Sequence, residues 1–154
     1  KEYTPVDSTF MTSGEIAPVA NTPLDFNTPT AIGARINQDN IQLHNANGYD
    51  HNWVLTGGPD IKRLTASVVS PITGIKLEVY TDKPGLQVYT GNFLDGTVTG
   101  KKGIAYQQRT AICLEPQVYP DSPNKKNLPG WYDPTVTPQK PYSHHFIYKF
   151  SVEK

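Results

Sequence analysis

The clearest pattern along the chain is an alternation of hydrophobic and polar residues with a period of two. It runs through residues 63–68, stops at the Pro- and Gly-containing segment 70–74, and resumes through residues 75–80. Successive side chains of a β-strand point to opposite faces, so each stretch has one hydrophobic face. Two such stretches joined by a short turn are typical of an antiparallel β-hairpin that buries one face.

Three further segments are expected to be strands. They are residues 86–90, residues 111–117 and residues 145–152, the last with three aromatic side chains at alternate positions. Several strands with a hydrophobic face, separated by turns rich in Pro and Gly, are typical of an antiparallel sandwich or barrel. The pattern therefore predicts an all-β fold, either an antiparallel β-sandwich or a barrel.

One short helix and three long irregular stretches are expected in the rest of the chain. Only residues 27–33 are expected to be helical, because a polar cap precedes a proline at the first turn. The stretches 8–27, 38–51 and 119–139 have no clear periodicity and are expected to be irregular. Loops of this length are uncommon unless they line a functional surface or belong to a larger assembly.

The composition agrees with this picture and excludes some partners. The 154 residues include 14 Pro and 12 Gly, which leaves little room for helices, and the length suits one domain, residues 1–154. Basic and acidic residues balance at 14 each, so the net charge attracts neither nucleic acid nor anionic lipid. The apolar runs are far shorter than the roughly 20 residues of a membrane span. We therefore expect neither nucleic acid nor a membrane as a partner.

The histidines do not form a recognised metal-binding pattern. His144 and His145 are adjacent, and neighbours on a strand point to opposite faces. The spacing of His44, Asp50 and His51 matches no metal motif either. We therefore expect no bound metal.

A carboxylate beside an apolar run is the first candidate for catalysis. Glu115 follows the run 112–114 and precedes Pro116. Carboxylates are rarely buried in a strand unless they are paired or functional, and burial would raise the pKa of Glu115 into a range that suits a general base. The alternative is a glutamate at a strand end that faces solvent. Cys113, in the same run, is expected to be inert packing.

Two other polar positions have the chemistry of a sugar-binding site. Asp50 lies in the segment 48–53, GYDHNW, where hydrogen-bonding groups stand beside aromatic rings. Sugar hydroxyls both donate and accept hydrogen bonds, so they are held by such groups. The alternative is a loop stabilised by its own Asx turns. Gln87 and Tyr89 project from one face of a predicted strand, and form either an exposed polar face or the floor of a pocket.

Several segments, in order along the chain, resemble motifs of the galactose mutarotase (aldose 1-epimerase) family. Taken together, in this order, they are specific, whereas any one alone would be weak. They are residues 3–9 (YTPVDST), 12–19 (TSGEIAPV), 48–53 (GYDHNW), 81–92 (TDKPGLQVYTGN) and 114–124 (LEPQVYPDSPN).

The resemblance implies part of a large antiparallel supersandwich that holds a sugar in an open cleft. It implies an aldose 1-epimerase, an isomerase that interconverts the α and β anomers of a free hexose such as glucose or galactose. The catalytic base of the family falls on Glu115, its substrate-binding aspartate on Asp50 and its cleft glutamine on Gln87; Pro116 stands where relatives often have Thr. No cofactor is implied, because the reaction involves neither a redox step nor a carbanion.

The resemblance covers only the C-terminal half of a family member. The segment with the general-acid histidine of the family would precede Lys1, and none of the four histidines present lies in a matching context. We therefore expect a complementary N-terminal polypeptide or half-domain as a partner, beside the hexose substrate. The cytoplasm is the expected compartment, with the periplasm as the alternative.

Two alternative functions stay open. One is a non-catalytic carbohydrate-binding β-sandwich that kept the cleft and lost the chemistry. The other is a hexose-6-phosphate 1-epimerase of the same superfamily, in which Lys125 and Lys126 would contact the phosphate, although paired lysines in such a loop are usually solvated.

Overall fold

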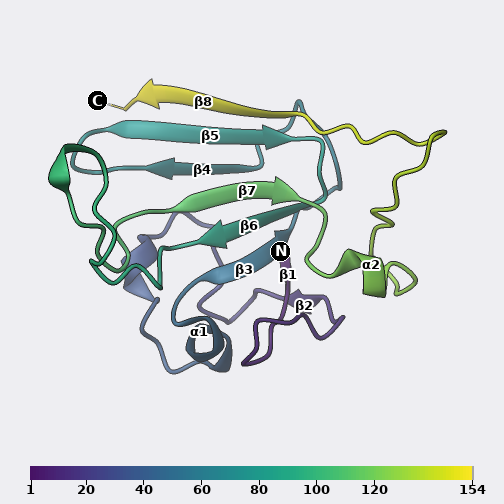
Figure 1. Cartoon of the computed structure of the whole chain (residues 1–154), viewed down its shortest axis with the longest axis horizontal. Coiled ribbons are helices and arrows are strands. Elements are labelled where there is room, and N and C mark those ends of the chain that lie inside the picture. The colour runs from purple at the N-terminus through teal and green to yellow at the C-terminus, as the bar shows by residue number, and fades with distance from the viewer. Residues whose placement is uncertain (154) are drawn as a thin grey trace.

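Eight β-strands form two antiparallel sheets within residues 1–153, the part of the chain that this computed structural model describes. The larger sheet has the strand order β2-β1-β3-β6-β7 and the smaller has the order β4-β5-β8. The smaller sheet lies above the larger one in Figure 1. The larger sheet contains β1 (Glu2–Thr4), β2 (Ala17–Pro18), β3 (Asp50–Val54), β6 (Gly85–Tyr89) and β7 (Cys113–Gln117); the smaller contains β4 (Ala66–Val69), β5 (Ile75–Thr81) and β8 (Phe146–Val152).

The two sheets pack against each other through apolar side chains. Alternation along β6 and β7 turns Leu86, Val88 and Leu114 to one side of the larger sheet, because Val88 and Leu114 are direct partners across the strands. There they join one hydrophobic cluster with Leu77 and Val79 of β5, and Val79 is completely buried. This packing makes an antiparallel β-sandwich, and the all-β fold class is confirmed.

The predicted hairpin is formed by β4 and β5, with Ala66 opposite Val79. The backbone N–H of Gly74 donates a 2.8 Å hydrogen bond to the carbonyl of Ser70 and closes the turn. Gly74 has a φ of 70°, and a Cβ atom there would lie 2.4 Å from the carbonyl oxygen of Glu153. Only glycine therefore fits this turn without strain.

A second hydrophobic core covers the β1 and β3 end of the larger sheet. Helix α1 (Ile41–Ala46) contributes to it. The side chain of Asn40 caps the start of α1 by accepting a hydrogen bond from the N–H of Gln42, and Asn47, with a left-handed backbone, ends the helix. The buried members of this core are Tyr3, Ala17, Val19, Leu24, Ile36, Leu43 and Tyr49.

The helices differ from the sequence-based expectation. The segment 27–33 was expected to be helical, but it contains only the start of the one-turn 3-10 helix η1 (Ile32–Ala34), because the backbone of Ala31 is still extended. Helix α1 lies in the segment 38–51, which was expected to be irregular. The remaining short helices are η2 (Lys101–Gly103) and α2 (Ser122–Lys125), and the latter lies in another stretch expected to be irregular.

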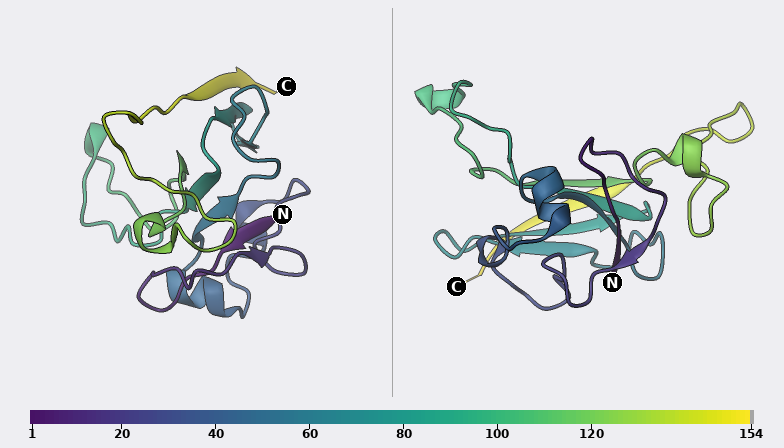
Figure 2. Two further views of the ribbon diagram at one scale, coloured as in Figure 1. Left: turned by 90° about the vertical axis from the view of Figure 1, so that its right-hand side faces the viewer. Right: turned by 90° about the horizontal axis from the view of Figure 1, so that it is seen from below.

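Strand β8 forms one edge of the smaller sheet and is exposed along its whole length. It is predicted correctly, including the shared face of Phe146, Tyr148 and Phe150, of which Phe150 is 66% exposed. The Tyr148 hydroxyl donates a hydrogen bond to the backbone carbonyl of Leu114 on β7, which ties the two sheets together. The left view of Figure 2 shows β8 at the margin of the molecule.

Residues 1–153 lack two further features, a membrane-spanning helix and a cluster of metal ligands. None of the helices there combines the length and the hydrophobicity that a membrane crossing requires. Nor do any three His, Cys, Asp or Glu side chains in this range gather closely enough to hold a metal ion.

Candidate active site

The candidate site lies on the face of the larger sheet that points away from the smaller sheet. Strands β3, β6 and β7 are neighbours there (Figure 1), and directly opposite residues of an antiparallel sheet point to the same side. The register therefore fixes which side chains share this face. One row across the three strands is Asn52, Gln87 and Glu115, and the next row is Asp50, Tyr89 and Cys113.

Asp50 and Gln87 are in direct contact. The side-chain amide of Gln87 donates a 2.8 Å hydrogen bond from Nε2 to Oδ1 of Asp50. Both side chains are half-buried, so the bond is partly shielded from water. The structure thus brings together two residues that the sequence singled out in separate segments.

Glu115 lies directly opposite Gln87 across β6 and β7, but it is exposed. The expectation of a buried carboxylate was wrong for this chain, because alternation turns the neighbouring Leu114 and Pro116 inward and Glu115 outward, on the edge strand of the sheet. Within residues 1–153 the carboxylate accepts no hydrogen bond and forms no ion pair. Its oxygens are therefore available to a ligand on this face.

Cys113 shares the site face rather than the core. It is half-buried beside Tyr89, two residues before Glu115. Burial raises the pKa of the Cys113 thiol above its usual range, and the charges of Glu115 and Asp50 raise it further. A thiol with a raised pKa stays protonated at neutral pH and is a weak nucleophile, so its expected inertness has a physical basis here.

Close approach of the strands at one end of the site depends on Gly85. A Cβ atom on Gly85 would lie 2.3 Å from Oδ1 of Asn52 and 2.9 Å from Cδ1 of Tyr119. The buried Asn52 donates a 3.4 Å hydrogen bond to the hydroxyl of Thr4 on β1. The missing side chain at Gly85 therefore lets a polar row continue from β1 to β7 on the site face.

His51 is adjacent to Asp50 but points to the opposite face of β3. It is fully buried between Tyr3 and Trp53, whose rings meet the imidazole edge to face at 6.1 and 6.3 Å. Burial lowers the pKa of His51 to about 4, so the imidazole is neutral at physiological pH. His51 is a core residue and does not serve the site directly.

Within residues 1–153, no histidine forms a hydrogen bond with the side chain of Asp50, Gln87 or Glu115; His51 only accepts one at Nδ1 from the backbone N–H of Asp50, at 3.2 Å. The described residues therefore place no imidazole beside these three side chains. The other three histidines have partners away from the site: His44 lies 3.4 Å from Asp39, His144 lies 3.2 Å from Tyr142, and His145 lies 3.0 Å from Asp82.

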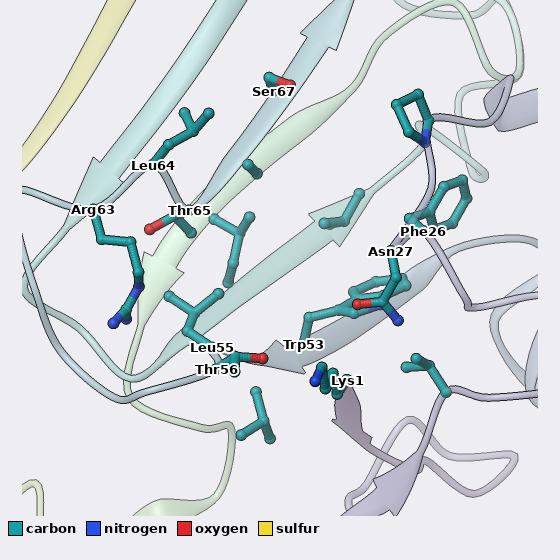
Figure 3. A pocket seen from close by; sticks show the side chains of 16 residues that line it. Lys1, Phe26, Asn27, Trp53, Leu55, Thr56, Arg63, Leu64, Thr65 and Ser67 are labelled. Carbon is teal, nitrogen blue, oxygen red and sulfur yellow. The ribbon is translucent and has the colours of Figure 1, made fainter.

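A cavity of about 460 Å³ lies on the other face of the larger sheet, towards β4. Figure 3 shows Phe26 and Trp53 on one side of it and Arg63, Leu64 and Thr65 on the other. Because Trp53 projects from the face of β3 opposite to Asp50, this cavity and the candidate site are separated by the sheet. None of the three predicted site residues lines it.

Comparison with known proteins identifies the family. The family model described as aldose 1-epimerase matches residues 1–149. The chain belongs to the aldose 1-epimerase family. Galactose mutarotase of Homo sapiens is 41% identical over 150 residues, which cover 97% of this chain and 41% of that protein. Aldose 1-epimerase of Escherichia coli (strain K12) is 35% identical over 154 residues, which cover 99% of this chain and 43% of that protein.

Solved structures of aldose epimerases share the fold. The GalM/aldose epimerase homologue from C. elegans superposes with a TM-score of 0.71 at 26% identity, covering 99% of this chain and 44% of that one. Galactose 1-epimerase from Lactobacillus acidophilus NCFM gives a TM-score of 0.67 at 25% identity, covering 99% and 42%. The chain thus spans about two fifths of the length of the aldose 1-epimerases that it matches.

Two side chains of the site face, Gln117 and Asn52, were not predicted from the sequence. Gln117 is half-buried there, and its Nε2 donates a 3.2 Å hydrogen bond to Oε1 of Gln87. The signal was present, because a period of two from Glu115 places Gln117 on the same face. Asn52 was not predicted as a site residue because the sequence did not predict strand β3.

Proposed function

We propose that the complete protein containing this chain is an aldose 1-epimerase that interconverts the α and β anomers of a free hexose. Membership of the family supports this activity. The observation that carries the proposal is the arrangement of three side chains on one sheet face. Glu115 lies opposite Gln87, and Gln87 is hydrogen-bonded to Asp50 at 2.8 Å.

Glu115 serves as the general base in the proposed mechanism. The reaction removes the proton of the C1 hydroxyl, breaks the bond between C1 and the ring oxygen, and protonates that oxygen to give the open-chain aldehyde. Rotation about the C1–C2 bond and ring closure, with both protons returned, give the other anomer. A positioned proton acceptor typically contributes about 10²–10⁴-fold to such a step.

Asp50 and Gln87 bind and orient the sugar in this proposal. Oδ1 of Asp50 accepts the hydrogen bond from Gln87, which leaves Oδ2 free for a sugar hydroxyl. The second N–H of the Gln87 amide is free to donate to another hydroxyl. Because each group offers one direction of hydrogen bonding, the pair favours a defined orientation of the ring relative to Glu115.

The proton for the ring oxygen requires an acid outside residues 1–153. We propose that it comes from a complementary N-terminal segment, in the same or a separate polypeptide, that also covers β8 and the free edge of β7. The exposed Phe146, Tyr148 and Phe150 support such a contact, because apolar side chains and strand edges in a sheet are normally covered. A cytoplasmic location, where free hexoses are metabolised, belongs to the same proposal.

The two alternatives have less support. Lys125 forms an ion pair with Asp121, and Lys126 lies 3.5 Å from Asp133, so both lysines already have carboxylate partners and are poorly suited to a sugar phosphate. A non-catalytic sugar-binding sandwich would have no need of a carboxylate at position Glu115. Both alternatives predict no acceleration of the anomerisation of a free hexose.

Polarimetry of freshly dissolved α-glucose and α-galactose tests the proposal on the complete gene product. We expect Glu115→Gln to lower turnover at least about a hundredfold, because the amide cannot accept the proton. Glu15→Gln, which changes an exposed glutamate in a loop, is the matched control and should keep wild-type turnover. Near-normal mutarotation by Glu115→Gln would exclude Glu115 as the base, and a wild-type protein without activity would exclude the function.

A further inference from the structure

Three side chains on the site face form a continuous chain of hydrogen bonds. Nε2 of Gln117 donates to Oε1 of Gln87 at 3.2 Å, and Nε2 of Gln87 donates to Oδ1 of Asp50 at 2.8 Å. The chain crosses the larger sheet from β7 through β6 to β3. Gln117 therefore reaches the sugar-binding aspartate through Gln87 rather than by direct contact.

The register allows this diagonal contact. The direct partner of Gln117 on β6 is Gly85, which has no side chain, and the next residue of β6 on the same face is Gln87. Diagonal neighbours on a sheet lie about 7–8 Å apart at the backbone, a distance that two long side chains can bridge. A glutamine at position 117 has the required length.

The carboxylate of Asp50 fixes the direction of the hydrogen bonds. The Oδ1 atom of Asp50 accepts here, so Gln87 has to turn its amide nitrogen towards it. The amide oxygen of Gln87 then faces Gln117, which has to donate. If the amide of Gln87 turned over, oxygen would face oxygen at Asp50 and nitrogen would face nitrogen at Gln117, and both hydrogen bonds would be lost.

We propose that Gln117 is a positioning residue of the epimerase site, which holds the amide of Gln87 with its nitrogen towards Asp50. The inference rests on the proposed function and adds a residue to it. Without the donor at Gln117, the amide of Gln87 loses one of its two anchors and samples other rotamers. The free N–H of Gln87 and the free oxygen of Asp50 are then no longer held in place for the sugar.

Three variants test this role in the complete gene product. Gln117→Met keeps the length of the side chain and removes the donor, whereas Gln117→Glu also keeps the length and places an acceptor against the oxygen of Gln87. Gln139→Met makes the same exchange at an exposed loop position and is the control. We expect both changes at Gln117 to raise KM roughly five- to tenfold, with a smaller effect on kcat, and the control to change neither.

A double-mutant cycle separates positioning from a general structural effect. If Gln117 acts through Gln87, the variant with both Gln87→Met and Gln117→Met should have the same KM as Gln87→Met alone. If instead the two losses multiply, Gln117 acts by another route and the proposal is overturned. Urea unfolding of each variant checks that stability does not account for the change.

An NMR measurement tests the contact independently of activity. The side-chain amide signal of Gln87 is assigned by its loss in Gln87→Met, and we expect its protons to be shifted and slow to exchange in the wild type. The signal should move towards that of a free glutamine in Gln117→Met, and stay in place in Gln139→Met. If Gln117→Met does not fold, Gln117→Glu is measured in the same way.

The outcomes distinguish the two proposals. An amide signal of Gln87 that does not change in the folded Gln117 variants would overturn the positioning role, whatever the activity. A wild-type protein that does not anomerise hexoses, but whose Gln87 signal responds to Gln117→Met, would retain the hydrogen-bond chain and refute the epimerase function.

Discussion

Gln87 and Glu115 are direct partners across the antiparallel strands β6 and β7, so their side chains leave the sheet on the same side. This relationship depends on strand register. A slip of one residue would turn Glu115 into the core and Leu114 outward. Burial of Leu114 and Pro116 opposes such a slip, and the hydrophobic core thereby sets the position of the proposed base relative to the proposed sugar-binding residues.

Replacement of Asp50 should weaken sugar binding more than it weakens the fold. Asp50→Asn removes the charge that the Gln87 amide and a sugar hydroxyl contact, and hydrogen bonds to charged groups are worth about 1.5–3 kcal/mol. We expect KM for the hexose to rise about tenfold or more. Initial-rate polarimetry over a range of sugar concentrations measures it. Asp39→Asn, at an exposed position, is the control, and an unchanged KM for Asp50→Asn would contradict the assigned role.

His51 should make the folded state sensitive to acid. Burial lowers the pKa of His51 to about 4 from its usual 6.5, so the unfolded chain binds the proton more tightly than the folded one. This contribution to stability is complete above about pH 6.5 and is lost as the pH falls towards 4. We expect about 2 kcal/mol less unfolding free energy at pH 5 than at pH 7 from this residue.

Urea unfolding of the complete gene product at the two pH values measures the effect of His51. His51→Gln should reduce the difference in unfolding free energy between pH 7 and pH 5. His44→Gln, which changes an exposed histidine, should leave it unchanged. A pH dependence that is the same in His51→Gln and the wild type would rule out this source.

The turn between β4 and β5 should not tolerate a side chain. Gly74→Ala imposes a φ of 70° on alanine and brings its Cβ to within 2.4 Å of the Glu153 carbonyl oxygen. We expect a loss of about 1–2 kcal/mol from the backbone conformation alone, with the clash adding to it. Thermal unfolding is the measurement. Gly33→Ala is the control, because no atom lies within 4 Å of a Cβ there, and equal stabilities of the two variants would contradict the prediction.

The hydrogen bond between the sheets should contribute measurably to stability. Tyr148→Phe removes the hydroxyl that donates to the Leu114 carbonyl and should lower the unfolding free energy by about 1 kcal/mol. Tyr80→Phe is the matched control, because Tyr80 lies on β5 and its hydroxyl has no hydrogen-bond partner within residues 1–153. If both variants unfold at the same urea concentration, the Tyr148 contact does not stabilise the sandwich.

The strands that alternation predicted are those with one apolar and one polar face. Strands β5 and β6 follow this rule, with Val79 and Leu86 in the core. Strand β3 was missed because His51 and Asn52, on opposite faces, are both polar and both buried, so no contrast in hydrophobicity marks it. Helix α1 was missed because it has only six residues and is defined by its caps rather than by a hydrophobic repeat.

The sequence proposed the candidate residues but not the contacts between them. The family motifs gave Asp50, Gln87 and Glu115, and the structure brings all three to one face. The contact between Gln87 and Asp50 joins two strands whose pairing the sequence did not reveal. The link from Gln117 to Gln87 depends on a diagonal across β6 and β7, which requires the register of both strands.

The open margin of β8 has a practical consequence for work with this chain. A strand with a free row of backbone N–H and carbonyl groups, and with Phe150 largely exposed, is a template for the β8 of a second molecule. We therefore expect the chain expressed by itself to self-associate and to form inclusion bodies. Co-expression with the proposed N-terminal segment, followed by analytical ultracentrifugation, tests whether covering this edge gives homogeneous material.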